Sequence, residues 1–378
     1  MGEAVKAFLI AGEASGDKLG GALMAGLRQI GPLQASGVGG AEMAGQGLSS
    51  LFPMSDLSVM GLAEVLPRYR QLKRRIREAA QAVIDTAPDV LITIDSPDFC
   101  LRVAKIVKAA RPDLPIIHYV APSVWAWRPG RAAKMARVVD HVLALLPFEP
   151  PYMHAAGLSC DFVGHPVVAD PAADPAQVAA LKAEGDGPIL CVLPGSRRGE
   201  VTRLAPVFGA TLTRLNWEGR VIVPVAPGLE ELVAQQVASW PVTPRLVLPG
   251  EGLRKQSVLA ASDLALAASG TVSLELAKAG TPMVIAYDMA WLSRQIMSRM
   301  VRIDTVTLVN LVSETRAVPE FIGARCRPEL IAPALDAVRH DPAAQTKAMS
   351  LTMERLGAGG EAPGLRAARS VAAFLDRA

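Results

Sequence analysis

The sequence predicts an α/β protein built from two doubly wound, Rossmann-like domains that face each other across a cleft. Its 378 residues exceed what one hydrophobic core usually serves, and 51% of them are apolar. Short apolar runs alternate with helical stretches along nearly the whole chain, as in parallel βαβ units. A Pro- and Ala-rich run that begins at Asp170 interrupts this alternation, and we take it as the domain boundary.

The first domain is expected to span residues 1–169, and the second residues 170–357. Apolar runs of the first domain predict strands at Val5–Ala11, Val90–Asp95, Ile116–Ala121, His141–Leu146 and Asp161–Val163. Helices are expected between them near Lys18–Ile30, Arg68–Thr86, Phe99–Ala110, Arg131–Val138 and Pro150–Ala156. Strands of the second domain are expected at Ile189–Leu193, Val221–Val225, Leu246–Leu248, Leu264–Ala267 and Met283–Tyr287. A last helix, within about residues 358–378, is expected to pack back on the first domain.

Bulk composition excludes several functions. The net charge of +3 is too small to imply a nucleic-acid partner, and no run approaches the 18 uncharged apolar residues of a membrane span. The N-terminus lacks the features of a signal peptide. The four cysteines are scattered without a CxxC pair, which suits a reducing cytoplasm and argues against disulfides and a zinc site. We therefore expect a cytoplasmic protein without a bound metal.

The loops that follow the strands are the candidate site, because ligands of doubly wound sheets bind beyond the carboxyl ends of the strands. The loop Ala11–Asp17 is rich in small residues, and Asp17 is expected to cap the next helix. Neither this loop nor Gly37-Val38-Gly39-Gly40 forms a GxGxxG fingerprint, which disfavours a nicotinamide cofactor. Asp95 ends a strand, where its carboxylate either accepts a proton from a hydroxyl nucleophile or caps a helix. For Asp98, capping is the expected role.

Another of these loops holds two of the five tryptophans, Trp125 and Trp127, followed by Arg128. The two rings either form a hydrophobic plug on the core or line the entrance for a sugar or an acyl chain. His118 and His165 have no partners at metal-ligand spacing, so we expect both to be hydrogen-bonded structural residues.

Two loops of the second domain are typical of phosphate binding. Gly195-Ser196-Arg197 precedes a helix whose free N–H groups favour an anion, and Arg197 adds a bidentate contact; the alternative is a surface turn with solvated arginines. Ser269-Gly270-Thr271 opens another helix, and Glu275 follows one turn later, where it can bind ribose hydroxyls. The sequence has no DxD element to hold a metal, and a helix dipole contributes only about 0.3–1 kcal/mol at an exposed site. Arg197 is therefore needed to meet the charge of a diphosphate.

Taken together, these loops resemble the lipid-A-disaccharide synthase family, whose members are inverting, metal-independent glycosyltransferases of the GT-B fold. The matching stretches follow the family's order and are Ala11–Asp17, Leu57–Leu66, Ile94–Phe99, His118–Arg128, Leu146–Pro150, Phe162–Pro166, Leu193–Arg197, Ala268–Glu275 and Val309–Leu311. The resemblance implies transfer from UDP-2,3-diacylglucosamine to 2,3-diacylglucosamine 1-phosphate. The products are then a β-1,6-linked disaccharide 1-phosphate and UDP, formed without a cofactor.

The resemblance also implies roles for individual residues. Asp95 matches the general base that deprotonates the acceptor's 6-hydroxyl. Contacts with the UDP-sugar are expected from Gly195, Ser196, Arg197, Ser269, Gly270, Thr271, Glu275 and Asn310. Acceptor or closure contacts are expected from Glu13, Ser15, Gly16, Trp125 and Arg128.

An apolar stretch, Val59–Leu66, is followed by a basic run from Arg68 to Arg77. The pattern fits either an ordinary amphipathic helix with a solvated basic face or a face that meets anionic lipid. Because the implied substrates carry acyl chains in the inner leaflet of the cytoplasmic membrane, the resemblance favours peripheral association with that leaflet. The membrane-facing residues are then expected to be Val59, Met60, Leu62, Leu66, Arg68, Arg74 and Arg75.

Three alternatives remain open at this point. A UDP-N-acetylglucosamine 2-epimerase, or another UDP-sugar transferase, has the same fold, although an epimerase needs no acyl pocket. A nicotinamide-dependent dehydrogenase is disfavoured by the missing fingerprint. A membrane-associated scaffold that has lost the chemistry is opposed by the presence of Asp95, Arg197 and Glu275.

Overall fold

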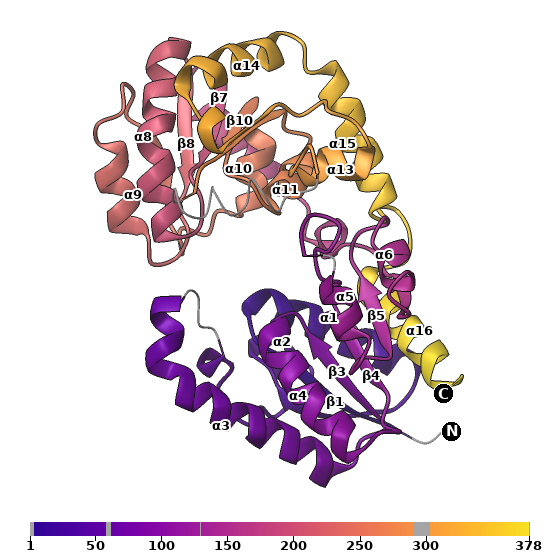
Figure 1. The fold of residues 1–378 in the computed structure, drawn as a ribbon. Coiled ribbons are helices and arrows are strands. Elements are labelled where there is room, and N and C mark those ends of the chain that lie inside the picture. Colours follow the sequence, from indigo (N-terminus) through magenta and orange to yellow (C-terminus); the bar gives the residue numbers. More distant parts are fainter. Residues whose placement is uncertain (1–3, 58–61, 129, 290–302, 378) are drawn as a thin grey trace. The chain divides into compact units, whose positions relative to one another are not determined.

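The chain forms two compact units, and each is a parallel β-sheet covered by helices (Figure 1). A computed structural model describes residues 4–57, 62–128, 130–289 and 303–377, except for the side chains of residues 62–68. Unit 1 comprises Met1–Ala169 and Gly359–Ala378, and unit 2 comprises Asp170–Ala358.

Unit 1 contains a parallel six-stranded sheet in the order β2-β1-β3-β4-β5-β6. The strands are β1 (Val5–Ala11), β2 (Leu33–Val38), β3 (Val90–Ile94), β4 (Ile116–Tyr119), β5 (His141–Ala144) and β6 (Ser159–Phe162). The helices are α1 (Ala14–Ile30), α2 (Ala41–Gly45), α3 (Leu62–Thr86), α4 (Pro97–Ala110), α5 (Gly130–Met135), α6 (Pro150–His154) and α16 (Pro363–Leu375). Short 3-10 helices lie at η1 (Met54–Asp56) and η2 (Pro166–Ala169).

Both faces of this sheet are covered, so its central strands are continuous apolar runs. Side chains of α3, α4 and α5 build the core on one face, and side chains of α1 and α16 build the core on the other. Strand β2 was missing from the sequence prediction. It lies at the sheet's edge and is only partly buried, so its sequence LQASGV carries no apolar run.

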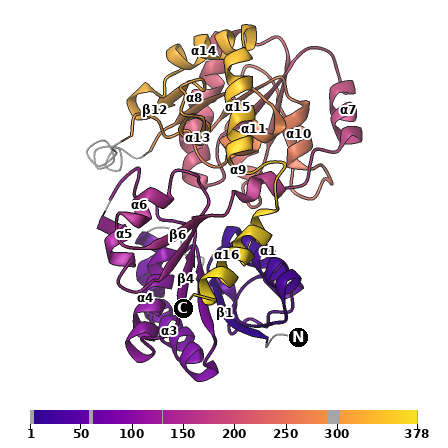
Figure 2. The same ribbon diagram turned by 90° about the vertical axis from the view of Figure 1, so that its right-hand side faces the viewer.

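Helix α16 packs along α1 (Figure 2). The two backbones approach closely, because a Cβ added at Gly26 would lie 2.5 Å from the carbonyl oxygen of Gly364. The buried His141 holds the same helix to the sheet: its Nε2 lies 2.9 Å from Ser370 Oγ, and its ring stacks on Phe374 at 4.8 Å. The last turns of the chain are therefore anchored to unit 1.

Unit 2 contains a second parallel six-stranded sheet in the order β12-β11-β10-β7-β8-β9. The strands are β7 (Ile189–Leu193), β8 (Arg220–Pro224), β9 (Arg245–Val247), β10 (Leu264–Ala267), β11 (Met283–Tyr287) and β12 (Glu320–Ile322). The helices are α7 (Pro175–Ala183), α8 (Arg198–Leu215), α9 (Glu230–Val237), α10 (Lys255–Ala261), α11 (Val272–Ala279), α13 (Leu308–Ser313), η3 (Gly323–Arg325), α14 (Pro328–His340) and α15 (Ala343–Arg355). The three-residue edge strand β12 was also missing from the sequence prediction.

Each sheet has one topological switch point, where the strand order reverses direction. In unit 1 it lies between β1 and β3, and in unit 2 it lies between β7 and β10. Loops that leave such neighbouring strands in opposite directions open a crevice at the carboxyl edge of the sheet, where ligands bind. The segments that follow these four strands carry Ser15, at the start of α1, and the loop residues Asp95, Arg197 and Gly270.

Candidate active site

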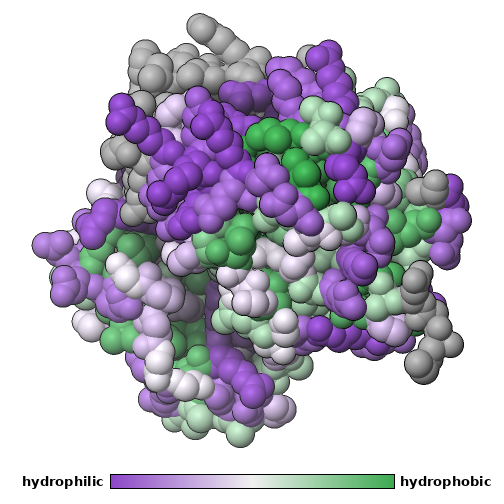
Figure 3. All heavy atoms as spheres, turned by 90° about the horizontal axis from the view of Figure 1, so that it is seen from below, coloured by the Kyte–Doolittle hydropathy of each residue, from purple (hydrophilic) through white to green (hydrophobic). Residues whose placement is uncertain are grey.

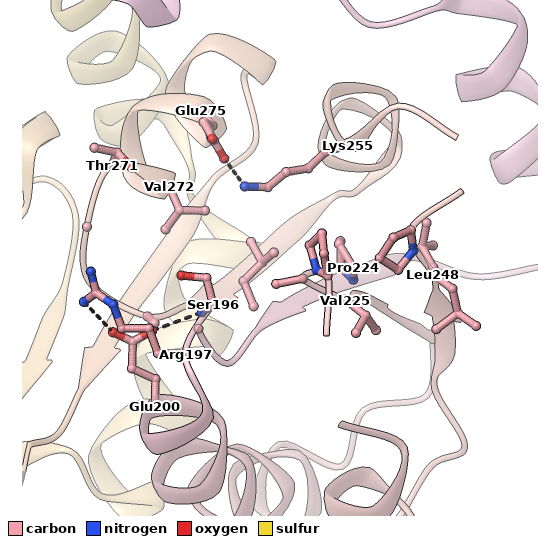
Figure 4. Close-up of a pocket in the computed structure, with 18 of the residues that line it drawn as sticks. Ser196, Arg197, Glu200, Pro224, Val225, Leu248, Lys255, Thr271, Val272 and Glu275 are labelled. Atoms are coloured by element: carbon pink, nitrogen blue, oxygen red, sulfur yellow. Dashed lines mark hydrogen bonds and ion pairs between the residues drawn. The ribbon is translucent and has the colours of Figure 1, made fainter. Parts of the chain in front are cut away.

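The carboxyl ends of β7, β8, β9 and β10 surround a cavity of about 660 Å³ in unit 2 (Figure 4). Seven of the eight residues expected to contact a UDP-sugar line it, namely Gly195, Ser196, Arg197, Ser269, Gly270, Thr271 and Glu275. The rest of the wall is largely apolar and includes Val225, Val247 and Leu248. The switch point of unit 2 thus brings together two loops that are about 70 residues apart in sequence.

The first loop is a tight turn fixed by Glu200, in the first turn of α8. Gly195 has a φ of +114°, and a Cβ there would lie 2.5 Å from Glu200 Cβ, so this position requires glycine. The Ser196 N–H donates to Glu200 Oε2 at 3.0 Å, and Arg197 Nη1 lies 3.5 Å from Glu200 Oε1. The Arg197 side chain is 62% exposed. Its guanidinium is therefore accessible to a ligand in the cavity.

Tyr287, at the end of β11, adds a third donor to the same carboxylate. Its hydroxyl donates to Glu200 Oε1 at 3.4 Å. Burial and the nearby negative charge of Glu200 raise the pKa of Tyr287, so it remains a protonated donor at neutral pH. Glu200 was not assigned a role from the sequence. Its position three residues after Arg197, within one helical turn, is the signal that points to the pair.

The second loop turns at Gly270, where φ is +144°, and leads into α11. Ser273 Oγ donates to the Gly270 carbonyl at 3.0 Å and holds the turn against the helix. Glu275 projects from the first turn of α11 and forms an ion pair with Lys255, at the start of α10. Lys255 also lines the cavity and was not singled out from the sequence.

The two loops carry groups of the kind that bind diphosphates in proteins. Helices α8 and α11 both begin at this cavity, where the positive ends of their helix dipoles favour an anion. Arg197 adds a full positive charge beside them. Glu275 offers carboxylate oxygens for hydroxyl groups, and the apolar wall suits a planar base. The arrangement fits a nucleoside diphosphate.

The structure does not bring Asn310 to this cavity. Its side chain is 1% exposed and is held inside unit 2: Nδ2 donates to the Val318 carbonyl at 2.8 Å, and Oδ1 accepts from the Val318 N–H at 2.9 Å. Asn310 borders a second cavity, of about 620 Å³, beside β12. These bonds give Asn310 a structural role in this conformation.

Asp95 lies at the switch point of unit 1. Its Oδ2 accepts from Ser15 Oγ, at the start of α1, at 3.3 Å, and its Oδ1 accepts from the Ser96 N–H at 2.8 Å. Asp95 and Ser96 both adopt left-handed backbone conformations, with φ of 52° and 43°. Such residues cost about 1–3 kcal/mol each and are concentrated at functional sites. A Cβ at Gly12 would lie 2.5 Å from Ser96 Oγ, so the loops after β1 and β3 are in close contact.

The other residues expected on the acceptor side have different surroundings. Gly16 is buried in α1, where a Cβ would lie 3.3 Å from the Ile94 carbonyl oxygen. Glu13 is half-buried at the N-cap of α1. Arg128 is exposed, and its guanidinium lies 4.3 Å above the Trp127 ring.

Two capping predictions were wrong. Helix α1 begins at Ala14, four residues earlier than predicted, so Asp17 lies inside it. Its buried carboxylate instead caps α2, accepting from the N–H groups of Gly40, Glu42 and Met43 at 2.7–3.1 Å. Asp98 lies in the first turn of α4 with its side chain 96% exposed, 3.9 Å from Arg131.

The tryptophan loop is fixed by Glu149, a carboxylate with no role assigned from the sequence. Glu149 Oε1 accepts from Trp125 Nε1 at 3.2 Å, and Oε2 accepts from the N–H groups of Leu145 and Leu146 at 3.1 and 2.9 Å. The half-buried Trp125 ring also meets Phe148 edge-on at 5.2 Å. Glu149 therefore ties the loop after β4 to the loop after β5.

Both histidines predicted to be structural are hydrogen-bonded, which confirms that part of the prediction. His118 Nδ1 lies 2.8 Å from Thr93 Oγ1 inside the sheet, and burial lowers the pKa of His118 to about 4. His165 Nδ1 accepts from the Val167 N–H at 3.1 Å.

Burial makes Glu149 a source of pH-dependent stability. The side chain is 4% exposed, and burial raises its pKa from about 4.5 to about 7, although its N–H donors favour the charged form. The folded protein therefore binds a proton more tightly than the unfolded chain. This stabilisation is complete below pH 4.5 and is lost as the pH rises to about 7, by roughly 3 kcal/mol from this group.

We expect Glu149→Gln to remove this contribution, so that urea unfolding between pH 5 and pH 8 shows a smaller loss of stability than in the unchanged protein. Glu78→Gln, which alters a more exposed carboxylate, is the control. Equal pH slopes for the unchanged protein and Glu149→Gln would contradict this assignment.

Two doubly wound units, the second with a cavity at its switch point, define the class of proteins with the GT-B fold. Solved structures agree on the fold. A putative UDP-N-acetylglucosamine 2-epimerase from Listeria monocytogenes matches with a TM-score of 0.62 and 14% identity, covering 99% of this chain and 97% of that chain. MurG from Acinetobacter baumannii matches with a TM-score of 0.59 and 13% identity over the full length of both chains.

Sequence similarity gives the family. The sequence model of a protein family described as lipid-A-disaccharide synthetase matches residues 7–364 of this chain. The chain is 64% identical to the lipid-A-disaccharide synthase of Ruegeria pomeroyi, covering 100% of this chain and 96% of that protein. It is 49% identical to that of Rhodospirillum centenum, covering 96% and 93%. The chain belongs to the lipid-A-disaccharide synthase family, and it is a glycosyltransferase of lipid A biosynthesis.

Proposed function

We propose that the chain transfers the sugar of UDP-2,3-diacylglucosamine to the 6-hydroxyl of 2,3-diacylglucosamine 1-phosphate. The products are a β-1,6-linked disaccharide 1-phosphate and UDP. The observation that carries the proposal is the convergence of Arg197, Gly270 and Glu275 on one cavity at the switch point of unit 2. Family membership supports the identity of the lipid substrates.

In this proposal, unit 2 binds the donor. The diphosphate is bound by Arg197 and by the N–H groups at the starts of α8 and α11. Glu275 accepts hydrogen bonds from the ribose, and the uracil lies against the apolar wall near Val225 and Leu248. These groups match the charge of the leaving UDP without a metal.

Unit 1 binds the acceptor, and Asp95 acts as the general base. Asp95 takes the proton of the acceptor's 6-hydroxyl as that oxygen attacks the anomeric carbon. The bond from the anomeric carbon to the diphosphate breaks, its electron pair leaves with UDP, and the configuration inverts. Ser15, which donates to Asp95 Oδ2, orients the carboxylate.

The test is an assay of the purified protein in detergent and EDTA with both lipid substrates, following UDP and disaccharide together. Formation of both products in equal amounts supports the proposal and its metal independence. UDP release without disaccharide would mean that the acceptor is another molecule. No turnover, or conversion of the nucleotide sugar without an acceptor, would overturn the proposed reaction.

We also propose that the enzyme acts at the inner face of the cytoplasmic membrane and collects its substrates there. Along the described residues, the chain has no helix long and apolar enough to cross a bilayer. On α3, the cationic side chains Arg70, Lys73, Arg74 and Arg77 are exposed. The face of the molecule drawn in Figure 3 carries both hydrophilic and hydrophobic side chains.

The structure describes the side chains of only two of the residues expected to face the membrane, Arg74 and Arg75. Val59 and Met60 lie outside the described residues, as do the side chains of Leu62, Leu66 and Arg68. Arg74 is exposed. Arg75 is instead paired with Asp56 at 2.6 Å and Glu78 at 2.7 Å, with its guanidinium 4.5 Å above Phe52. The charge of Arg75 is thus compensated by carboxylates of unit 1.

Reversing the charges of Lys73, Arg74 and Arg77 to glutamate is expected to weaken association with anionic vesicles by tenfold or more, since each basic residue near such a surface contributes about 1 kcal/mol. The measurement is co-sedimentation with phosphatidylglycerol vesicles, compared with neutral phosphatidylcholine vesicles. Lys347→Glu, on α15 of unit 2, is the control. Unchanged sedimentation of the triple variant would remove α3 from the proposed contact.

A further inference from the structure

Lys255 and Glu275 form an ion pair inside the donor cavity. Lys255 begins α10, Glu275 lies in the first turn of the neighbouring α11, and Lys255 Nζ contacts Glu275 Oε2 directly. In Figure 4 this pair and the pair Arg197–Glu200 occupy different ends of the cavity. Among the described residues, two carboxylates line the cavity, and each forms an ion pair with one cation: Glu275 with Lys255, and Glu200 with Arg197.

We propose that Lys255 is a positioning residue that orients Glu275 for the ribose of the donor, a role that rests on the proposed function. The ammonium binds one carboxylate oxygen, Oε2, and leaves Oε1 free to accept a ribose hydroxyl. Lys255 would thereby determine how well the enzyme distinguishes a ribonucleotide from a deoxyribonucleotide.

Two physical arguments support this role. A glutamate side chain has several rotatable bonds, so an unpaired Glu275 would have to be ordered when the ligand binds, at a cost in affinity. The incoming diphosphate is also negatively charged, and it would repel a carboxylate in the same cavity unless that charge is compensated. Lys255 meets both requirements, because it restrains Glu275 and neutralises it.

The exposure of the pair indicates that its main effect is on binding. The side chains of Lys255 and Glu275 are 42% and 26% exposed. Ion pairs that contact solvent contribute little to folding stability. Removing the ammonium should therefore leave the protein folded while it changes the binding of a ligand that uses Glu275.

The experiment measures the binding of UDP, 2′-deoxy-UDP and 3′-deoxy-UDP to the full chain by calorimetry. The unchanged protein should prefer UDP over at least one deoxy analogue. Lys255→Met should weaken UDP binding about 10- to 150-fold, as expected for a hydrogen bond to a charged group, and should reduce the preference for the ribose hydroxyl. Lys255→Arg should retain most of both, and Glu275→Gln should lose the preference as well. Lys347→Met is the matched control on α15.

Each other outcome overturns the inference. If Lys255→Met weakens UDP binding but leaves the preference for ribose unchanged, and uridine binding is unaffected, then Lys255 contacts the diphosphate. If neither the UDP affinity nor the preference for ribose changes in Lys255→Met, Lys255 has no role in binding. If the unchanged protein shows no preference for ribose, Glu275 does not bind the ribose hydroxyls. Failure of the unchanged protein to bind UDP at all would instead reject the proposed function, and the inference with it.

Discussion

Asp95→Asn is expected to reduce disaccharide formation by about 100- to 10,000-fold, the usual contribution of a general base. Asparagine has the same shape as aspartate and retains an oxygen that can accept from Ser15 or from the Ser96 N–H. It cannot take the proton of the attacking hydroxyl at neutral pH. UDP binding should be unchanged, because the cavity proposed to bind the donor is lined, among the described residues, by residues of unit 2.

Two quantities are therefore measured for each variant: the kcat for disaccharide formation and the Kd for UDP. Asp98→Asn is a close control, since Asp98 lies three residues further on, its side chain is 96% exposed, and its contact with Arg131 is long, at 3.9 Å. We expect it to keep nearly full activity. Activity of Asp95→Asn within tenfold of the unchanged protein would remove Asp95 from the chemical step. Loss of UDP binding or of cooperative unfolding would indicate a structural role.

The parts of the fold that were predictable are those in which burial imposes an apolar run. Strands β1, β7, β10 and β11, which are interior strands with buried apolar runs, begin and end where the sequence indicates. The edge strand β2 was missed because partial burial allows polar residues in it. The start of α1 was misplaced because Asp17, a typical cap residue, caps a different helix.

The same distinction applies to the site. Gly195 and Gly270 could be assigned to the site from the sequence, because each is a glycine in the loop that follows a predicted strand. The positive φ that each adopts favours glycine at such a turn. Glu149 and Lys255 were missed because their side-chain partners, Trp125 and Glu275, are 24 and 20 residues away. No local spacing predicts such a pair, since it depends on which loops the sheet brings together. Asn310 was assigned to the site by resemblance, while its side chain is bonded within unit 2.

Arg197→Met is expected to lower kcat by about 100- to 1,000-fold, because electrostatic stabilisation of a leaving group depends on charges already in place. Negative charge develops on the diphosphate as its bond to the sugar breaks, and Arg197 is the cation at that end of the cavity among the described lining residues. Arg197→Lys should recover only part of this loss, since a lysine retains the charge but not the bidentate geometry.

The comparison of UDP with uridine identifies what Arg197 contacts. Arg197→Met should weaken UDP binding and leave uridine binding unchanged, if the guanidinium meets only phosphate. Arg198→Met, in the first residue of α8, is the control, because Arg198 is exposed and does not line the cavity. Equal effects of both substitutions would mean that general charge, and not the position of Arg197, governs binding.

Glu200 gives this prediction a further test. In Arg197→Met, the Glu200 carboxylate loses its nearby cation and faces the diphosphate with its charge uncompensated. Part of the loss should then be repulsion, which the second substitution Glu200→Gln removes. We expect the double variant to bind UDP more tightly than Arg197→Met alone, and a double-mutant cycle measures the difference. If the double variant is instead weaker, the main role of Glu200 is to hold the Ser196 turn, and its charge is secondary.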